Sequence, residues 1–271
     1  MPELPEVETT RRGLDPHVCG RIIAAVTLRE RRLRWPVPRG LAKSLIGRQV
    51  REMDRRGKYL LMRLDEGCLL LHLGMSGSLR LVAPGTPAAK HDHVDIIFDQ
   101  GRCLRLRDPR RFGSLHYTRG DPLQHRLLAS LGPEPLGPDF DGDYLHRRSR
   151  RRTQSVKTFI MDSRIVTGVG NIYANEALFL SGIHPQRQAG RVSLARYRRL
   201  AESIKRVLLL AIDKGGTTLR DFTSGEGRPG YFRQELSVYD RAEAPCRICA
   251  SPIRQRRIGQ RSSFYCVNCQ R

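Results

Sequence analysis

Residues 58–82 read KYLLMRLDEGCLLLHLGMSGSLRLV, and this stretch indicates the fold of the amino-terminal half. It contains short apolar runs that are separated by turn residues, and further runs follow it. The runs are Lys58–Leu64, Cys68–Leu73, Ser78–Val82, Val94–Phe98 and Arg102–Arg107. Many short strands at close spacing are typical of an antiparallel sandwich or barrel. We therefore expect antiparallel β-structure up to about residue 118.

Helical patterns flank these strands on both sides. Residues 5–14 are expected to form a short helix that Gly13 can end. Asn171–Leu180 is a second expected helix. A longer one begins after Ser193, where apolar side chains recur at helical spacing until Gly215 stops it. Strands followed by helices predict an α+β chain of more than one domain.

The net charge is extreme for a chain of 271 residues. Lys and Arg total 49 and Asp and Glu total 27, so the formal charge is 49 − 27 = +22. Such an excess points to a polyanionic partner, either nucleic acid or an acidic membrane surface. No apolar run reaches the ~18 residues that a membrane-spanning helix needs, so we expect nucleic acid and no membrane. The first residues lack the features of a secretory signal, and we expect a cytoplasmic protein.

A change of composition marks a boundary near the middle of the chain. Gly132–Pro138 is rich in Gly and Pro, and Arg147–Arg152 is a basic run. The basic run fits a solvated linker and a phosphate contact equally well. The predicted parts are an N-terminal β-domain at residues 1–131, a hinge at 132–152, a helical domain at 153–235 and a cysteine-bearing module at 236–271.

Four cysteines near the end of the chain have the spacing of a metal site. Cys246 and Cys249 form one Cys-x2-Cys pair, and Cys266 and Cys269 form a second pair after sixteen intervening residues. Zn²⁺ binds four thiolates in a tetrahedron that leaves no open position. We predict one structural Zn²⁺ that supplies folding energy to a small module; the alternative is four unrelated thiols. The remaining cysteines, expected to be free buried thiols, are Cys19, Cys68 and Cys103.

The amino terminus can be interpreted chemically. Removal of Met1 is expected because the second residue is small, and it exposes Pro2 as a secondary amine. An α-amino group has a pKa of about 7.7–8.0, against ~10.4 for lysine, so a useful fraction is neutral and able to form a Schiff base with an electrophilic carbon. Glu3 is adjacent and suits proton transfer. The alternative is that an acidic residue before a helix only suits the helix dipole.

Several segments carry a resemblance that covers essentially the whole chain. They are Pro2–Thr9, His72–Gly77, Asp108–Gly113, Gly168–Ala174 and Gly215–Thr218, followed by the four-cysteine module. In this order they resemble formamidopyrimidine-DNA glycosylase, the bacterial 8-oxoguanine glycosylase. The resemblance implies an N-terminal antiparallel β-sandwich, a helix–two-turns–helix module and a zinc finger. It also implies a monomeric DNA repair enzyme that excises oxidised purines from double-stranded DNA and cuts the strand at the abasic site by β,δ-elimination.

The same resemblance implies a catalytic set. Pro2 would attack the sugar C1′ and form a covalent imine, and Glu3 would shuttle protons and assist ring opening. Lys58 would be an acid or base partner near the sugar and phosphate. Arg261 would bind phosphate and assist the second strand cut. From the residues alone, Lys58 and Arg261 are interpreted as plain surface charge.

The resemblance further implies a set of DNA contacts. A target carbon inside a duplex requires the nucleotide to rotate out of the stack, and Met75, Arg110 and Phe112 are similar to the residues that fill the space. Core packing is the ordinary alternative for Met75 and Phe112, although the Gly-Met-Ser-Gly context favours a loop. The other residues that match DNA-contact positions are His91, Arg151 and Asn171.

Residues 217–231, rich in Gly, Ser and Thr, resemble the family's mobile loop that closes over the flipped base. Two rival functions stay open. One is the sister enzyme that prefers oxidised pyrimidines, although the Leu-Pro-Glu-Val-Glu opening favours the purine enzyme. The other is a zinc protein that binds DNA without catalysis.

Overall fold

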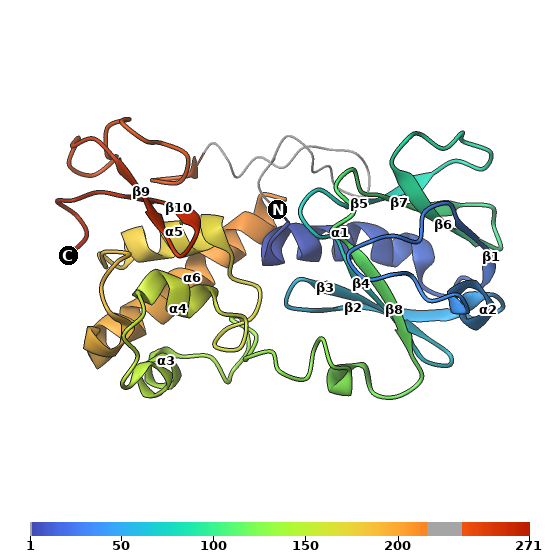
Figure 1. The fold of residues 1–271 in the computed structure, drawn as a ribbon, viewed down its shortest axis with the longest axis horizontal. Helices are drawn as coiled ribbons and strands as arrows, with labels where there is room; N and C mark the ends of the chain where they lie inside the picture. The colour runs from blue at the N-terminus through green and yellow to red at the C-terminus, as the bar shows by residue number, and fades with distance from the viewer. Residues whose placement is uncertain (1, 216–234) are drawn as a thin grey trace. The chain divides into compact units, whose positions relative to one another are not determined.

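The computed structural model describes residues 2–215 and 235–271. The chain divides into two units, Met1–Ala129 with Lys214–Tyr231 and Ser130–Asp213 with Phe232–Arg271 (Figure 1). The four-part division predicted from the sequence stays a prediction. Among the described residues, no helix combines the length and the apolar character that crossing a membrane requires.

The first unit contains two four-stranded antiparallel sheets. One has the strand order β1-β6-β7-β5 and the other the order β2-β3-β4-β8. The antiparallel β-structure predicted from residues 58–82 is therefore confirmed. The bounds are β1 Ile23–Leu28, β2 Val50–Arg56, β3 Tyr59–Leu64, β4 Cys68–His72, β5 Ser78–Val82, β6 Asp92–Phe98, β7 Cys103–Arg107 and β8 Ser114–Thr118.

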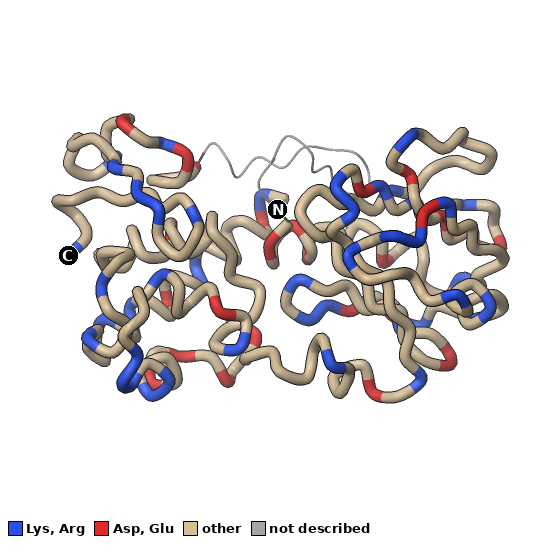
Figure 2. Tube along the Cα trace, in the orientation of Figure 1, with Lys and Arg blue, Asp and Glu red and all other residues tan. Residues whose placement is uncertain are grey.

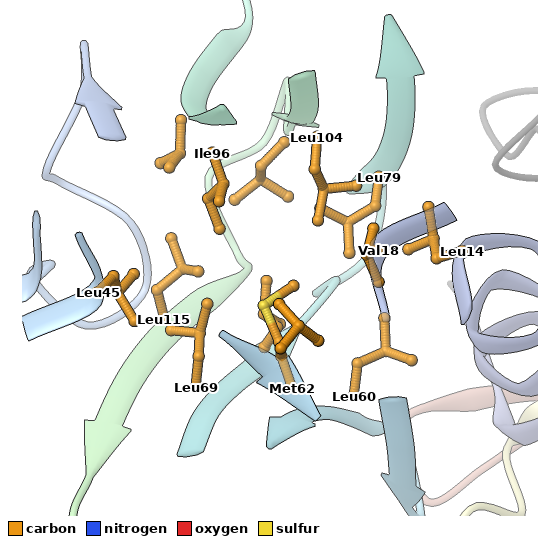
Figure 3. Packing of buried hydrophobic residues seen from close by; sticks show 14 of the residues in the cluster. Leu14, Val18, Leu45, Leu60, Met62, Leu69, Leu79, Ile96, Leu104 and Leu115 are labelled. Atoms are coloured by element: carbon orange, nitrogen blue, oxygen red, sulfur yellow. The ribbon is translucent and has the colours of Figure 1, made fainter. Parts of the chain in front are cut away.

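The two sheets share one apolar core (Figure 3). Leu60 and Met62 project from alternate positions of β3, as the two-residue period of a strand requires. Ile96 and Leu104 enter the same cluster from the other sheet. Burial of each such side chain contributes about 1.5–3 kcal/mol, so the sandwich holds its connecting loops on a rigid support.

Helix α1, Leu4–Val18, packs against β2 and β3. It is longer than predicted, because it continues through Gly13 and Pro16, and the prediction that Gly13 ends it is wrong. A glycine inside a helix costs about 1 kcal/mol. The burial of Leu14 and Val18 in the sandwich core outweighs this cost. A short helix, α2 (Leu41–Leu45), and the 3₁₀ turn η1 (Pro122–Gln124) complete the described elements of the unit.

The second unit is helical. Helix α5 spans Asn171–Leu180, as predicted, and α6 (Leu194–Asp213) follows Ser193 and ends before Gly215, whose φ is +73°. Helix α3, Gly142–Ser149, lies in the segment interpreted as a hinge, and its N-terminus is capped by the side chain of Asp141. The remaining elements are α4 Val156–Met161, the 3₁₀ turn η2 Ala189–Arg191, and the hairpin strands β9 Arg254–Ile258 and β10 Arg261–Tyr265.

Candidate functional site

The predicted nucleophile and its acidic neighbour lie at the start of α1. Pro2 is buried, and Glu3, which is 2% exposed, is the N-cap residue of the helix. Glu3 and Glu6 form a capping box, in which the Glu3 N–H donates to Glu6 Oε2 at 2.9 Å. The first helical bond runs from the Val7 N–H to the Glu3 carbonyl oxygen at 3.1 Å. The backbone at Glu3 is therefore fixed on both sides.

Lys58 lies at the tip of the hairpin between β2 and β3. Arg56 pairs with Tyr59, so Gly57 and Lys58 form a two-residue turn, and Gly57 adopts the positive φ of 58° that such turns use. Lys58 is half-buried. A two-residue turn with a glycine fixes the position of Lys58 relative to the ends of β2 and β3.

His72, at the end of β4, lies near Lys58. Burial, together with the positive charges of Lys58 and Arg34, lowers the pKa of His72 to about 4. The Gly74 N–H donates to His72 Nδ1 at 3.0 Å, so the neutral ring carries its proton on Nε2. His72 therefore presents a neutral N–H donor beside the Lys58 cation, at the point where the chain enters the Gly74–Gly77 loop.

The loops that carry Met75 and Phe112 are in direct backbone contact. A Cβ atom on Gly74, which has φ +66°, would lie 2.4 Å from the Phe112 carbonyl carbon, so only glycine allows this approach. Phe112 is 41% exposed, and the Arg110 guanidinium carbon lies 4.8 Å from the centre of its ring. Met75 is half-buried. The structure therefore brings these three predicted residues to neighbouring loops, and Phe112 does not belong to the core.

Asp108 holds this group of loops together from inside. It is fully buried, and its carboxylate accepts from the Ser76 hydroxyl at 3.2 Å and from the Gly113 N–H at 2.7 Å. Its carbonyl oxygen lies 2.8 Å from His93 Nε2, and its N–H donates to the His91 carbonyl oxygen at 3.0 Å. His91, a predicted DNA contact, is thereby attached to the same loops.

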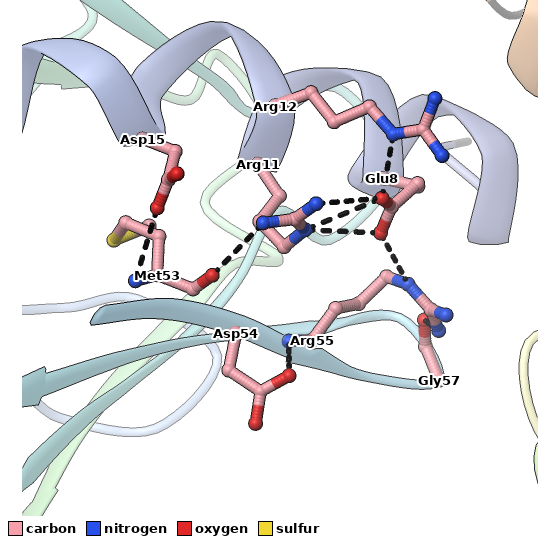
Figure 4. A network of polar contacts seen from close by, with 8 residues as sticks. All are labelled: Glu8, Arg11, Arg12, Asp15, Met53, Asp54, Arg55 and Gly57. Atoms are coloured by element: carbon pink, nitrogen blue, oxygen red, sulfur yellow. Dashed lines mark hydrogen bonds and ion pairs between the residues drawn. The ribbon is translucent and has the colours of Figure 1, made fainter.

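A second network, around Glu8 of α1, joins the helix to β2 (Figure 4). The Glu8 carboxylate accepts from Arg11 at 2.9 Å, from Arg12 at 2.8 Å and from Arg55 at 3.0 Å. Burial alone would raise the pKa of Glu8, but these arginines lower it to about 2. The carboxylate is therefore ionised at every physiological pH. Arg55 Nη1 also donates to the Gly57 carbonyl oxygen at 3.1 Å.

In the second unit, Asn171 is bonded to the residue that follows Arg261 in the chain. Asn171 Nδ2 donates to the Ser262 carbonyl oxygen at 3.0 Å, directly after Arg261 at the start of β10. Fully buried Lys157 of α4 donates to the same oxygen at 2.8 Å and to Ser263 Oγ at 2.6 Å. Arg261 itself is exposed. Its hairpin is thus bonded to α4 and to the first residue of α5.

Arg151 is exposed and lies just beyond α3, with a positive φ of 61°. The basic run that it belongs to begins within the last turn of α3, where cations are favoured by the helix dipole. Lys and Arg are distributed over both units (Figure 2). The predicted loop at residues 217–231 lies outside the described residues.

The four cysteines predicted to bind zinc form a cluster. Their sulfur atoms all lie within 4.8 Å of one another, and the Cys246–Cys269 and Cys249–Cys266 pairs are 3.9 and 3.4 Å apart. A tetrahedral zinc with Zn–S bonds of ~2.3 Å needs sulfurs ~3.8 Å apart, so the cluster fits such an ion. In the part of the chain that the structure describes, this is the one group of three or more potential ligands.

Several organising residues were missed by the sequence interpretation. Glu8, Asp108 and Lys157 are charged yet buried, and each has at least one partner that is distant in sequence. Glu176 of α5, 3% exposed, belongs with them, because its carboxylate accepts the N–H groups of Ser237, Val238 and Tyr239 at 2.8, 2.9 and 2.8 Å. Only Asp108 had a local signal, since it opens an Asp-Pro turn segment.

Known proteins resemble the chain over its full length. The family model for the formamidopyrimidine-DNA glycosylase N-terminal domain matches residues 1–115, and that for the formamidopyrimidine-DNA glycosylase H2TH domain matches residues 131–223. A formamidopyrimidine-DNA glycosylase of Nitrosococcus oceani is 61% identical over 270 residues, with 100% of both chains covered.

Solved structures resemble it equally throughout. The crystal structure of the MutM (Fpg) protein from Thermus thermophilus has a TM-score of 0.90 at 38% identity and covers 99% of this chain and 98% of that one. A complex between the Lactococcus lactis Fpg and DNA containing an abasic site has a TM-score of 0.93 at 32% identity and covers 100% of both chains. Both similarities extend over the two units.

Proposed function

The chain belongs to the formamidopyrimidine-DNA glycosylase family and is a DNA-binding glycosylase of DNA repair, and on this premise we propose that it excises oxidised purines and then cuts the strand. The substrates are 8-oxoguanine and formamidopyrimidines in duplex DNA, and abasic sites. The protein acts as a monomer. The proposal rests on the family, on the Pro2–Glu3 pair and on the loops around Asp108.

The reaction begins with the Pro2 amine that removal of Met1 frees. Its lone pair attacks C1′ of the damaged nucleotide, the bond from C1′ to the base breaks, and the base leaves with that electron pair and takes a proton from water. The Glu3 carboxylate accepts the amine proton and passes it to O4′ as the C1′–O4′ bond opens. C1′ is then doubly bonded to nitrogen. Because proline is a secondary amine, this iminium keeps a positive charge that accepts electrons afterwards.

Strand cutting uses the iminium as an electron sink. Loss of the C2′ proton sends an electron pair towards the iminium, the C3′–O3′ bond breaks, and the 3′ phosphate leaves. Loss of the C4′ proton then expels O5′ in the same way. Lys58, beside the sugar, and Arg261, on the hairpin, stabilise the phosphates during these steps, as charge-assisted hydrogen bonds to a leaving oxygen would.

The start of α1 supports this chemistry most directly. The positive end of the helix dipole disfavours an ammonium group, which favours the neutral, nucleophilic form of a freed amine at Pro2. Glu3, 2% exposed, offers a carboxylate one residue away and away from bulk water.

Recognition requires the damaged nucleotide to leave the stack. Met75 and Phe112 occupy the space as apolar wedges, and Arg110, which stacks on the Phe112 ring, hydrogen-bonds the base that loses its partner. Phosphate contacts fix the duplex. The residues proposed for them are Lys58, His91, Arg151, Asn171 and Arg261.

The four-cysteine cluster holds one Zn²⁺ in this proposal; its members are Cys246, Cys249, Cys266 and Cys269. When bound, the ion supplies folding energy and takes no part in the reaction, because four thiolates leave it no open position. The side chains packed on this module include Phe179 of α5. The zinc module thus carries the Arg261 hairpin.

Borohydride trapping tests the proposed chemistry. Borohydride reduces an iminium to a stable amine, so the untagged protein is expected to become covalently joined to a duplex with an abasic site. A protein with a tag before Pro2 should bind the duplex but not be trapped. Absence of trapping by the untagged protein would favour a DNA binder without catalysis.

Paired excision assays test the substrate class. Duplexes with 8-oxoguanine or thymine glycol are compared under single-turnover conditions, and faster excision of 8-oxoguanine is expected. Faster excision of thymine glycol would assign the chain to the pyrimidine-preferring sister enzyme.

A further inference from the structure

One guanidinium group joins the first helix to the turn that carries Lys58 (Figure 4). Arg55 Nε donates to Glu8 Oε2 of α1 at 3.0 Å, and Arg55 Nη1 donates to the Gly57 carbonyl oxygen at 3.1 Å. Both side chains are shielded, with 12% of Arg55 and 10% of Glu8 exposed. We call this pair the Glu8–Arg55 bridge.

We infer that Glu8 and Arg55 are positioning residues for the reaction, because the bridge fixes the Lys58 hairpin tip relative to the helix that begins at Pro2 and Glu3. This inference rests on the proposed role of Lys58 beside the sugar. It adds two residues that touch neither DNA nor the reacting atoms and act through Lys58.

The bridge reaches the turn, whereas two further bonds between α1 and β2 lie at Met53, three residues before the end of the strand. Arg11 Nη1 donates to the Met53 carbonyl oxygen at 3.1 Å, and the Met53 N–H donates to Asp15 at 3.4 Å. Both bonds fasten β2 several residues before its end. Arg55 is therefore bonded to the two-residue turn itself, through the Gly57 carbonyl oxygen. A small rotation of this turn would displace the long Lys58 side chain.

The chemistry of the bridge suits a fixed distance. Two donors on one planar guanidinium set the angle between the helix carboxylate and the turn carbonyl, and a lysine in place of Arg55 could not reproduce that geometry. Glu8 is also bonded by Arg12 at 2.8 Å, but 60% of the Arg12 side chain is exposed, and this bond stays within α1. Arg12 is therefore the matched control for loss of one Glu8 partner.

Single-turnover excision of 8-oxoguanine by R55K, E8Q, R12A and K58A tests the inference. R55K and E8Q are expected to lose on the order of 10- to 100-fold in rate, since small misplacements of a reacting group cost this much. The affinity of both variants for undamaged duplex should stay within about 2-fold of wild type. R12A, the control, should excise 8-oxoguanine at the wild-type rate. Circular dichroism establishes whether each variant is folded at the assay temperature. If R55K does not fold, E8Q alone tests the inference.

A double-mutant cycle separates positioning from general stabilisation. If Arg55 acts through Lys58, the excision rates of the double variants R55K/K58A and E8Q/K58A should lie within about 2-fold of the rate of K58A alone. Rate losses that multiply in the double variants would overturn the inference. Wild-type excision by K58A would overturn it as well, and would leave the Pro2 chemistry to be judged separately by borohydride trapping.

Discussion

Pro2 and Glu3 are neighbours in the chain, but the proposed reaction gives them different tasks. Pro2 supplies an electron pair, and Glu3 moves a proton from nitrogen to the ring oxygen. The Glu3 backbone is held by Glu6 Oε2 at 2.9 Å, and Glu3 is 2% exposed. The start of the helix therefore fixes the backbone from which the carboxylate projects, and the side chain is shielded from bulk solvent.

Replacement of Glu3 by glutamine is predicted to remove proton transfer while leaving the nucleophile. A positioned general acid or base contributes about 10²- to 10⁴-fold, so excision of 8-oxoguanine by E3Q should fall at least 100-fold. Affinity for a duplex with an uncleavable abasic-site analogue should change little. The matched control is E202Q, at an exposed residue of α6. Excision by E3Q within 10-fold of wild type would exclude Glu3 as the proton shuttle.

Residues with a local signal could be predicted from the sequence, and those defined by tertiary partners could not. Cysteine spacing located the four-cysteine cluster, and the glycines around Met75 indicated a loop. Lys157 and Glu8 gave no such signal, because charged residues are exposed by default. Each has a partner that is distant in sequence: Ser263 lies 106 residues from Lys157, and Arg55 lies 47 residues from Glu8.

At the scale of elements, patterns of apolar residues predicted where strands and helices lie, whereas the single residue Gly13 did not predict where a helix ends. The strands between residues 58 and 107 agree with the sequence prediction, and so does α5. Gly13 did not end α1, because core packing of Leu14 and Val18 extends the helix beyond it. Helix α3 was missed, since its polar sequence and nearby prolines favour a linker.

The contact between α1 and β2 should weaken in acid. The folded-state pKa of Glu8 is about 2, because burial raises it less than the arginines lower it, against 4.5 as its ordinary value. The ionised carboxylate therefore stabilises the fold above about pH 4.5, and this contribution is lost as the pH falls towards 2. A pKa difference of about 2.5 corresponds to roughly 3 kcal/mol in the free energy of unfolding at neutral pH.

Urea unfolding at pH 7, 4.5 and 2.5 measures that contribution. The free energy of unfolding of E8Q should lie below that of wild type by about 2–3 kcal/mol at pH 7, and the gap should shrink as the pH falls. E52Q, at a carboxylate whose side chain is 64% exposed, provides the control. A gap that is independent of pH would rule out the ionic explanation.

The cysteine module should depend on its metal for folding. One zinc per chain is expected by elemental analysis, and C249S should lose it whereas C19S, at a half-buried cysteine outside the cluster, should keep it. Chelation should lower the affinity for duplex DNA, because the Arg261 hairpin belongs to this module. Full affinity after verified loss of zinc would contradict a structural role.

For the whole molecule, a charge of +22 implies binding that is dominated by phosphate contacts. Each contact releases counterions and contributes about −0.9 to the slope of log K against log salt concentration, so a slope of about −3 or steeper is predicted for the proposed cations. R261A should make the slope shallower by about 0.9. Titrations of a duplex between 50 and 300 mM salt, roughly, would measure it, and a flat response would contradict a basic DNA-binding surface.

The identity of the trapped nitrogen tests the proposed mechanism most directly. After borohydride reduction with an abasic duplex, nuclease and trypsin digestion, mass spectrometry locates the sugar remnant. We predict it on the Pro2 nitrogen of the peptide that ends at Arg11, with Met1 absent. A remnant on Lys58, or on any other side-chain amine, would contradict the account.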